Sequence, residues 1–401
     1  MKLGSEIFIE KKHYQKIGKK RVGLLAHPAS VNKALEHIAD ILQKKLKDRF
    51  TCAFGPQHGM RGDKQDNMIE SDDFQDPKLQ IPIYSLYGKH RRPTQESLDN
   101  LDVLLVDLQD IGTRLYTYVT TLYYMMEALS GSGKELWVLD RPNPAGRKVE
   151  GPILENYFTS FVGCHPGLIH RHGLTLGELG NYFLAEKKFD LEYKVIKMQG
   201  YQANKTPGWG WPTNEYAWVN PSPNIPTLAS CHTFAGTVLI EGTTLSEGRG
   251  TTRPLELIGA PDIDATAVIK KMYSLSKKWS GGCILRPCYF EPTFHKHAKV
   301  LNSGIHVHVD YKGYNANNFS AFRTVALTLK AIRSLYPDYD LWKKPPYEYE
   351  LEKMPIDLIC GTAKLREWVD DPAAKVSDLE GFLKPKEEAW KKSSKRFKLY
   401  V

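Results

Sequence analysis

The sequence has 401 residues, of which 41% are hydrophobic and 25% charged, a composition typical of a globular protein with room for two domains. The formal net charge is +9, but many of the lysines lie near the two ends of the chain, so we interpret the excess as solvated surface and expect no nucleic acid partner. No apolar run approaches the ~20 residues that span a bilayer, and the N-terminal stretch lacks the apolar core of a signal peptide, which predicts a cytoplasmic protein without membrane contact.

Strands and helices alternate through residues 21–144. We expect strands at 21–27, 51–54, 81–88, 102–112 and 135–144, and helices at 34–45, capped by Ser30 or Asn32, and at 115–129. A further short helix is expected after Thr94. The run 102–112 is continuously apolar, as required of a parallel strand that is buried on both faces. The pattern therefore predicts an α/β fold with a parallel sheet covered by helices on both faces.

Polar clusters lie at the carboxyl ends of these five strands. They are His27-Pro28, Gln57-His58, Tyr87-Gly88, the segment 107–110 and the segment 140–143. The carboxyl ends of parallel strands meet at one edge of a sheet, where open α/β proteins bind their ligands. The densest loop is 53–70, whose glycines permit sharp turns. Its polar residues are Gln57, His58, Arg61, Asp63, Lys64, Gln65, Asp66, Asn67 and Glu70.

The second half of the chain has a different pattern. Residues 150–260 are rich in Gly, Pro and aromatic residues, with a helix expected at 176–187 behind a Thr175 and Glu178 capping box and a strand at 192–198. Long loops in a compact protein are usually functional. From about residue 262 we expect helices at 265–279, 318–335, 364–369 and 376–392, and strands at 283–294 and 304–310. We therefore divide the chain into an α/β domain, 1–260, and a smaller α+β domain, 261–401.

Motifs for several common chemistries are absent from the sequence. The first strand is followed by His27-Pro28-Ala29 instead of a glycine-rich phosphate cradle, residues 130–134 do not fit a P-loop, and no G-x-S-x-G elbow occurs. The six cysteines show no metal-ligand spacing, which favours free thiols in a reducing compartment. The histidine pairs 295/297 and 306/308 lack nearby carboxylates. We therefore expect neither a cofactor nor a metal.

Carboxylates in glycine-rich loops remain as candidates for catalysis, because glycoside hydrolysis uses a general acid with a base or nucleophile. These candidates are Glu70, Asp107, Asp110, Glu150, Glu241 and Glu247. Glu241 is expected to follow a strand at 237–240, and Glu247 shares a tight turn with Arg249. The last two either pair with each other, or burial raises the pKa of Glu247 and makes it a proton donor. Four arginines are suited to grip a substrate carboxylate: Arg61, Arg114, Arg141 and Arg249.

Long ordered motifs also carry a resemblance to a known family. The segments 55–62, 82–94, 102–121, 139–152, 160–179, 221–227 and 241–252 resemble the exo-β-N-acetylmuramidase family of peptidoglycan hexosaminidases, formerly a domain of unknown function. The likeness extends from about residue 21 to the C-terminus. It implies a Rossmann-like domain, a smaller second domain and an active-site cleft between them. It also implies removal of N-acetylmuramic acid from the non-reducing end of β-1,4-linked wall fragments. Family members are often exported.

One position departs from the family pattern. Many members have Glu-His-Gly where this chain has Gln57-His58-Gly59, and an amide cannot perform acid–base catalysis. Either this subgroup uses another carboxylate, or its substrate differs, or it does not hydrolyse. A 2-acetamido sugar can supply its own nucleophile, and one acid would then be enough.

These observations together predict a glycosidase with a small saccharide substrate. We assign catalysis to Glu247, Glu241, Asp110 and Glu70, and substrate binding to Gln57, His58, Arg61, Arg114, Tyr116, Arg141, Glu150 and Arg249. The first alternative is a saccharide-binding protein that has lost catalysis at Gln57. The second is a transferase or phosphate-ester enzyme, which the missing phosphate loop disfavours.

Overall fold

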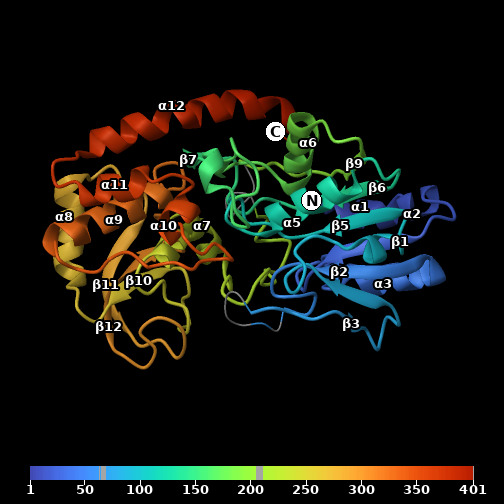
Figure 1. Cartoon of the computed structure of the whole chain (residues 1–401), viewed down its shortest axis with the longest axis horizontal. Coiled ribbons are helices and arrows are strands. Elements are labelled where there is room, and N and C mark those ends of the chain that lie inside the picture. The colour runs from blue at the N-terminus through green and yellow to red at the C-terminus, as the bar shows by residue number, and fades with distance from the viewer. Residues whose placement is uncertain (63, 65–68, 205–210, 401) are drawn as a thin grey trace.

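The computed structural model describes residues 1–62, 64, 69–204 and 211–400. Two layered parts lie side by side, and the long helix α12, Val376–Ser394, runs along both of them (Figure 1). Among the helices of these ranges, none combines the length and the apolar character that crossing a bilayer demands.

The larger part contains a sheet of seven strands drawn from the described residues, in the order β3-β4-β2-β1-β5-β6-β9. All neighbours pair in parallel except β3, which runs antiparallel to β4 at one edge. The strands are β1 Val22–Ala26, β2 Phe50–Gly55, β3 Phe74–Gln75, β4 Pro82–Ser85, β5 Val103–Asp107, β6 Glu135–Leu139 and β9 Glu192–Ile196. The predicted parallel sheet is thus confirmed, and its strands end at one edge.

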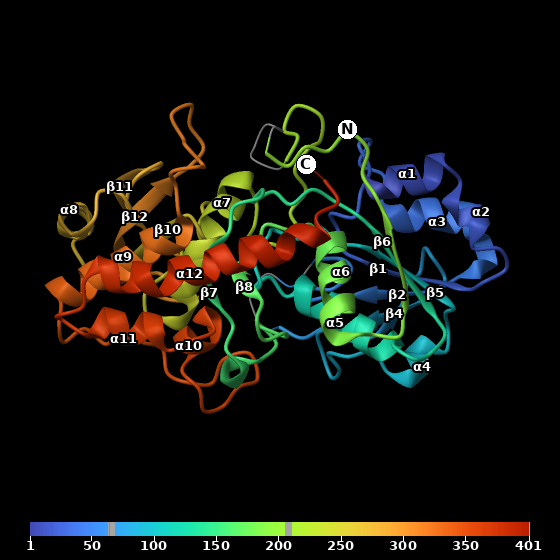
Figure 2. The same cartoon turned by 90° about the horizontal axis from the view of Figure 1, so that it is seen from above.

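Helices cover both faces of this sheet (Figure 2). One face, with Leu24 and Leu105, packs on α1 and α3, while the other, with Leu25 and Leu104, packs on α5. Neighbouring residues of one strand therefore enter different cores, which explains why the strand sequences are apolar throughout. The helices of this part are α1 Gly4–Glu10, α2 His13–Lys16, α3 Ile38–Leu46, α4 Gln95–Leu98, α5 Tyr118–Leu129 and α6 Leu176–Lys187.

The smaller part has an antiparallel sheet in the order β10-β12-β11, packed against helices. Its elements are α7 Leu228–Thr237, β10 Leu257–Ala260, α8 Ala265–Leu275, β11 Ile284–Phe290, β12 Asn302–His308, α9 Ala321–Leu335, α10 Pro355–Cys360 and α11 Lys364–Asp370. A short antiparallel pair, β7 Glu150–Ile153 and β8 Ile169–Arg171, lies between the two parts. The chain then returns to the larger part through α12, where Trp390 Nε1 donates to the His172 carbonyl at 2.9 Å.

Several predicted elements are confirmed with their caps. Helix α6 begins after Thr175, whose hydroxyl accepts from the Glu178 amide in the expected capping box. Thr94 caps α4 in the same way. The helix predicted at 34–45 begins only at Ile38, because the Asn32 side chain accepts from two following amides and holds residues 32–36 in a turn.

The segment before Glu241 was predicted wrongly. Residues 238–242 form a 3-10 helix, Val238–Gly242, that continues from helix α7. Nearly every residue of α7 is buried, so the helix has no polar face and lacks the amphipathic period that reveals a helix in a sequence.

The strand β10 bears on the division of the chain. It was placed in the first domain, yet it pairs with β12 in the smaller sheet. Helix α7 also packs closely on α9, because a Cβ at Gly236 would lie 2.0 Å from the Ala321 carbonyl oxygen. We therefore propose that the boundary lies just before α7 instead of at residue 260.

Candidate active site

A small cavity lies beyond the carboxyl ends of β2 and β5, where the two parts meet. Its volume is about 40 Å³. It is lined by Gln57, His58, Leu115, Tyr116, Thr117, Val162, Ser222, Asn224, Ile225, Phe234, Val238, Glu241, Arg249, Leu255, Tyr347 and Glu348. Five of the predicted site residues are therefore brought together: Gln57, His58, Tyr116, Glu241 and Arg249.

The loop after β2 supplies Gln57 to the cavity. The backbone turns sharply there, since a Cβ at Gly55 would lie 2.6 Å from the Met60 nitrogen and His58 has a φ of 70°. The hydroxyl of Thr117 donates to Gln57 Oε1 at 2.7 Å. Because its oxygen is occupied in this way, the Gln57 amide directs its NH₂ group at the carboxylate of Glu348.

A tight turn of the smaller part supplies Glu348 from the opposite side. Tyr347 and Glu350 exchange two backbone hydrogen bonds of 2.9 Å, and the residues between them have φ values of 44° and 71°. Two positive φ values mark a type I′ turn, which normally favours Asn and Gly. Glutamate and tyrosine at these positions cost backbone strain, a feature that concentrates at functional sites. The strained turn projects Glu348 inward, where it is only 6% exposed.

The surroundings of Glu348 favour its neutral form. Burial, with Glu241 nearby, raises the pKa of Glu348 to about 7, although hydrogen bonds from Tyr87 and Gln57 act in the opposite direction. The Tyr87 hydroxyl, which follows β4, donates to Glu348 Oε2 at 2.9 Å. A carboxyl group in this state can hold a proton near neutral pH and release it to a bound ligand.

Glu241 and Glu247 belong to a buried ionic cluster centred on Arg249. The guanidinium donates to Glu241 at 2.6 Å and to Glu247 at 3.1 Å, and Lys296 Nζ donates to Glu247 at 3.0 Å. Glu241 also accepts from the Tyr347 hydroxyl at 2.8 Å. Despite its burial, Glu247 has a pKa lowered to about 2, because Lys296, Arg249 and His295 surround it with positive charge. The pairing of Glu247 with Arg249, expected as one of two outcomes, is the one observed.

Glu247 does not line the cavity; it lies behind Arg249. A carboxylate held in its ionised form by two cations is poorly suited to donate a proton. Its contacts favour a different role, in which it fixes the guanidinium of Arg249.

Three predicted binding residues lie in buried structural contacts outside the cavity. Arg114 is fully buried and donates to the Ile359 carbonyl at 2.9 Å, Arg141 pairs with Asp107, and Glu150 accepts from Ser320 at 2.6 Å while pairing with Arg171. Glu150 thereby ties β7 to the start of α9. Buried ion pairs and ligand sites use the same types of side chain, so the residue types alone do not tell one from the other.

The predicted binding residue Arg61 and the predicted catalytic residue Glu70 lie at the surface. The Arg61 guanidinium stacks over Phe74 at 4.5 Å, and Glu70 pairs with Arg91 at 3.1 Å and accepts from the Tyr349 hydroxyl at 3.1 Å. Glu70 thus holds the outer side of the turn that carries Glu348. Four other residues of this predicted loop, Asp63, Gln65, Asp66 and Asn67, lie outside the described residues.

Asp110 is buried next to the cavity without lining it. It accepts from the Gly112 amide at 2.7 Å, and its other oxygen has no hydrogen-bond partner among the described residues. Burial raises the pKa of Asp110 to about 7. Its environment favours a protonated acid here as well, but Asp110 is not among the residues that line the cavity of Gln57 and Glu348.

Glu348, Tyr87 and Tyr347 were not predicted as site residues from the sequence. The first and last lie in the run Pro-Pro-Tyr-Glu-Tyr-Glu at 345–350, far from the predicted strand ends. A cluster of aromatic and acidic residues after two prolines is the only local signal, and it is weak. Tyr87 was predicted to lie at the end of a strand, but its hydrogen bond to Glu348 was not predicted.

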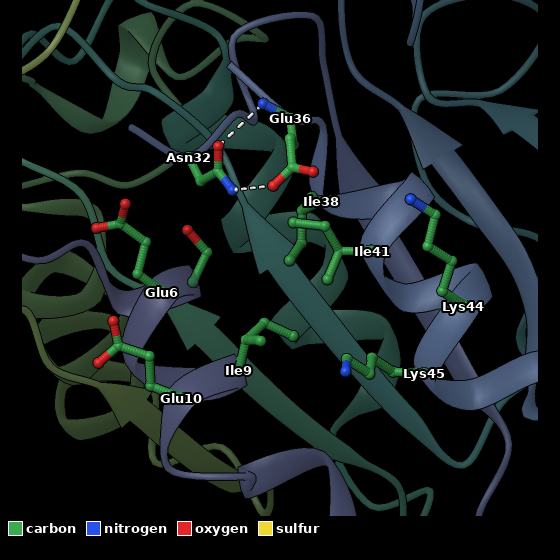
Figure 3. A pocket seen from close by; sticks show the side chains of 10 residues that line it. Glu6, Ile9, Glu10, Asn32, Glu36, Ile38, Ile41, Lys44 and Lys45 are labelled. Carbon is green, nitrogen blue, oxygen red and sulfur yellow. Dashed lines mark hydrogen bonds between the residues drawn. The ribbon is translucent and has the colours of Figure 1, made fainter. Parts of the chain in front are cut away.

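A second, wider cavity of about 410 Å³ lies between α1 and α3 (Figure 3). Its floor is formed by Ile9, Ile38 and Ile41, and Asn32 and Glu36 are hydrogen-bonded at its rim. None of the predicted catalytic or binding residues lines it. It lies on the sheet face covered by α1 and α3 and shares no lining residue with the cavity that contains Gln57 and Glu348.

Comparisons with known proteins cover the whole fold. Residues 22–229 match the family "Exo-beta-N-acetylmuramidase NamZ, N-terminal", and residues 232–400 match its C-terminal counterpart. A "Peptidoglycan beta-N-acetylmuramidase NamZ" of Bacillus subtilis (strain 168) is 38% identical over 382 residues, which are 95% of this chain and 87% of that protein.

Solved structures agree with this. A DUF1343 family protein from Bacteroides fragilis NCTC 9343 superimposes with a TM-score of 0.86 at 29% identity, covering 100% of this chain and 99% of that one. A second such protein from the same organism has a TM-score of 0.71 at 26% identity, covering 100% and 98%. The chain belongs to the exo-β-N-acetylmuramidase NamZ family, as its motifs predict.

Proposed function

We propose that this protein is a glycoside hydrolase that removes N-acetylmuramic acid from the non-reducing end of β-1,4-linked peptidoglycan fragments. The observation that carries the proposal is the relative named as a peptidoglycan β-N-acetylmuramidase, which aligns with 95% of the chain. The cavity supports it, because a buried carboxyl group with a pKa near neutrality lies at the edge where α/β sheets bind ligands.

The cavity is too small for a whole sugar in this conformation. A volume of about 40 Å³ holds roughly one water molecule or a small substituent. We propose that the turn 347–350 moves away from Gln57 and His58 to admit the sugar ring. Motions of such loops commonly enclose a substrate and exclude water during the reaction.

Arg249 is the one arginine of the four predicted that lines the described cavity, and we propose that it attracts the lactyl carboxylate of the sugar. A guanidinium suits this task because it can form two parallel hydrogen bonds with a carboxylate. The six cysteines, all within the described ranges, are free, which supports the cytoplasm as the compartment of action.

The alternative of a saccharide-binding protein is less well supported. It rested on the loss of a glutamate at residue 57, yet the cavity retains a protonatable carboxyl group in Glu348. Binding alone does not call for a buried acid of raised pKa.

A chromogenic β-N-acetylmuraminide, compared with the matching glucosaminide, tests the proposal. We expect release of the chromophore from the muraminide only, with equal rates in the presence and absence of EDTA. Saccharide binding in calorimetry without release from either compound would instead establish the binding protein.

A further inference from the structure

We propose that Glu348 is the catalytic acid of this enzyme and takes over the proton-transfer role that an amide at Gln57 cannot perform. This inference rests on the proposed glycosidase function. It concerns a residue from the smaller part of the chain, so the reaction would depend on both parts.

The first support is the position of the carboxyl group. Glu348 lines the same cavity as Gln57, and the Gln57 amide donates to it directly. A glutamate at residue 57 would place a second carboxylate against Glu348. With glutamine there, the amide orients a single acid, and Thr117 fixes the amide through its bond of 2.7 Å to Gln57 Oε1.

The second support is the elimination of its neighbours as proton donors. The two oxygens of Glu241 accept from Arg249 and from Tyr347, and Glu247 is held by Arg249 and Lys296. Each of these two carboxylates is thus held in an ion pair with a cationic group. The donors that face Glu348 at hydrogen-bond distance, Tyr87 and Gln57, are neutral.

The charges facing Glu348 from each packed element are of both signs. The sheet edge contributes Tyr87 and the more distant cation Arg91, the ionic cluster contributes the anion Glu241, and the turn itself contributes Tyr349 beside Tyr87. Burial and the anion raise the pKa of Glu348, whereas Arg91 and the two hydrogen bonds lower it. The balance leaves the acid protonated up to about neutral pH.

Hydrolysis of the glycosidic bond by this acid needs water as its only other reactant. The bond between the anomeric carbon and the leaving oxygen breaks, its electron pair stays on that oxygen, and the oxygen takes the proton of Glu348. Water supplies a hydroxyl group to the anomeric carbon, either directly or after the acetamido oxygen of the substrate has bonded there. The remaining proton of that water returns to the Glu348 carboxylate, which restores the enzyme.

Leaving-group dependence tests this role. Glu348→Gln should lower kcat/KM by about 10²–10⁴-fold on N-acetylmuramyl-β-1,4-N-acetylglucosamine, whose leaving oxygen requires a proton. The same variant should stay within about tenfold of the natural protein on 2,4-dinitrophenyl β-N-acetylmuraminide, whose leaving group departs as an anion. Glu352→Gln, an exposed carboxylate of the same segment, is the matched control and should leave both rates unchanged.

The double variant Gln57→Glu with Glu348→Gln provides an independent measurement. It moves the carboxyl group across the hydrogen bond, and we expect it to recover at least about tenfold of the lost kcat/KM on the disaccharide, because general acid catalysis needs the proton and not a particular side chain. Tyr87→Phe should shift the alkaline limb of the pH–rate profile upward, because the lost hydrogen bond no longer stabilises the ionised form.

The outcomes separate this inference from the function on which it rests. If the natural protein cleaves the muraminide and Glu348→Gln loses the same factor on both substrates, or none on either, Glu348 is not the acid and the function still stands. If the natural protein cleaves neither substrate, both proposals are overturned.

Discussion

Two buried glutamates of this molecule have pKa values that are shifted in opposite directions. Glu247 is fully buried and has a pKa lowered to about 2, whereas Glu348 is 6% exposed and has a pKa raised to about 7. Both lose their hydration, so burial alone raises the pKa of each. The difference comes from their partners, which are cations for Glu247 and neutral donors with a nearby anion for Glu348. The charge of the partners, not the depth of burial, decides which carboxylate can act as an acid.

The largest effect on stability is expected from the cluster that holds Glu247. Arg249→Met should lower the free energy of unfolding by about 3–5 kcal/mol, because it leaves two carboxylates buried with one cation fewer. Urea unfolding at pH 7 measures this. Arg396→Met, which removes an exposed pair with Glu186, is the control and should cost less than about 1 kcal/mol. Equal losses in the two variants would mean that the buried cluster is not held by its charges.

A smaller effect, on the pH dependence of stability, is expected at Glu348. Its native pKa of about 7 exceeds the ordinary value of 4.5, so the native state binds the proton more tightly than the unfolded state. This contribution is complete below pH 4.5 and is lost as the pH rises through 7. Glu348→Gln should therefore lose less stability between pH 4.5 and 8 than the natural protein, by on the order of 1–3 kcal/mol.

Glu247 provides the opposite case for the same measurement. Its native pKa of about 2 lies below 4.5, so its contribution is present above pH 4.5 and is lost as the pH falls towards 2. Glu247→Gln should be most destabilised at neutral pH and approach the natural protein in acid. Parallel pH profiles for the two variants would refute the contrast between these glutamates.

The smallest effect is expected at the surface, where Glu70 touches Arg91 and Tyr349 outside the turn. Glu70→Gln should change kcat/KM on a muraminide by less than about fivefold, because exposed ion pairs contribute about 0–1 kcal/mol. A loss of 10²-fold or more would return Glu70 to the catalytic residues predicted from the sequence and weaken the assignment of Glu348.

Much of the fold could be predicted because it depends on local pattern. The apolar runs at β1, β5 and β6, the capping box of α6 and the Thr94 cap of α4 are properties of short segments, and the structure confirms them. Helix α7 was not predicted, because it is buried on all sides and its sequence therefore lacks the alternation of apolar and polar residues by which amphipathic helices are recognised. The strand β10 was not predicted, because its pairing with β12 joins residues that lie far apart in the sequence.

The features of the candidate site likewise fall into those that the sequence determined and those that depend on tertiary structure. The sequence by itself determined that polar residues gather at the carboxyl ends of the parallel strands, that residue 57 is an amide, and that the chain carries the motifs of its family. Only the tertiary structure decided which carboxylates are paired with cations, because Arg249 meets Glu241, Glu247 meets Lys296, and Glu348 meets Tyr87 across 261 residues of sequence. Protonation depends on distances of a few ångströms between such groups, and those distances exist only once the chain has folded. For Glu348 and Tyr87, the two parts of the chain must also have packed together.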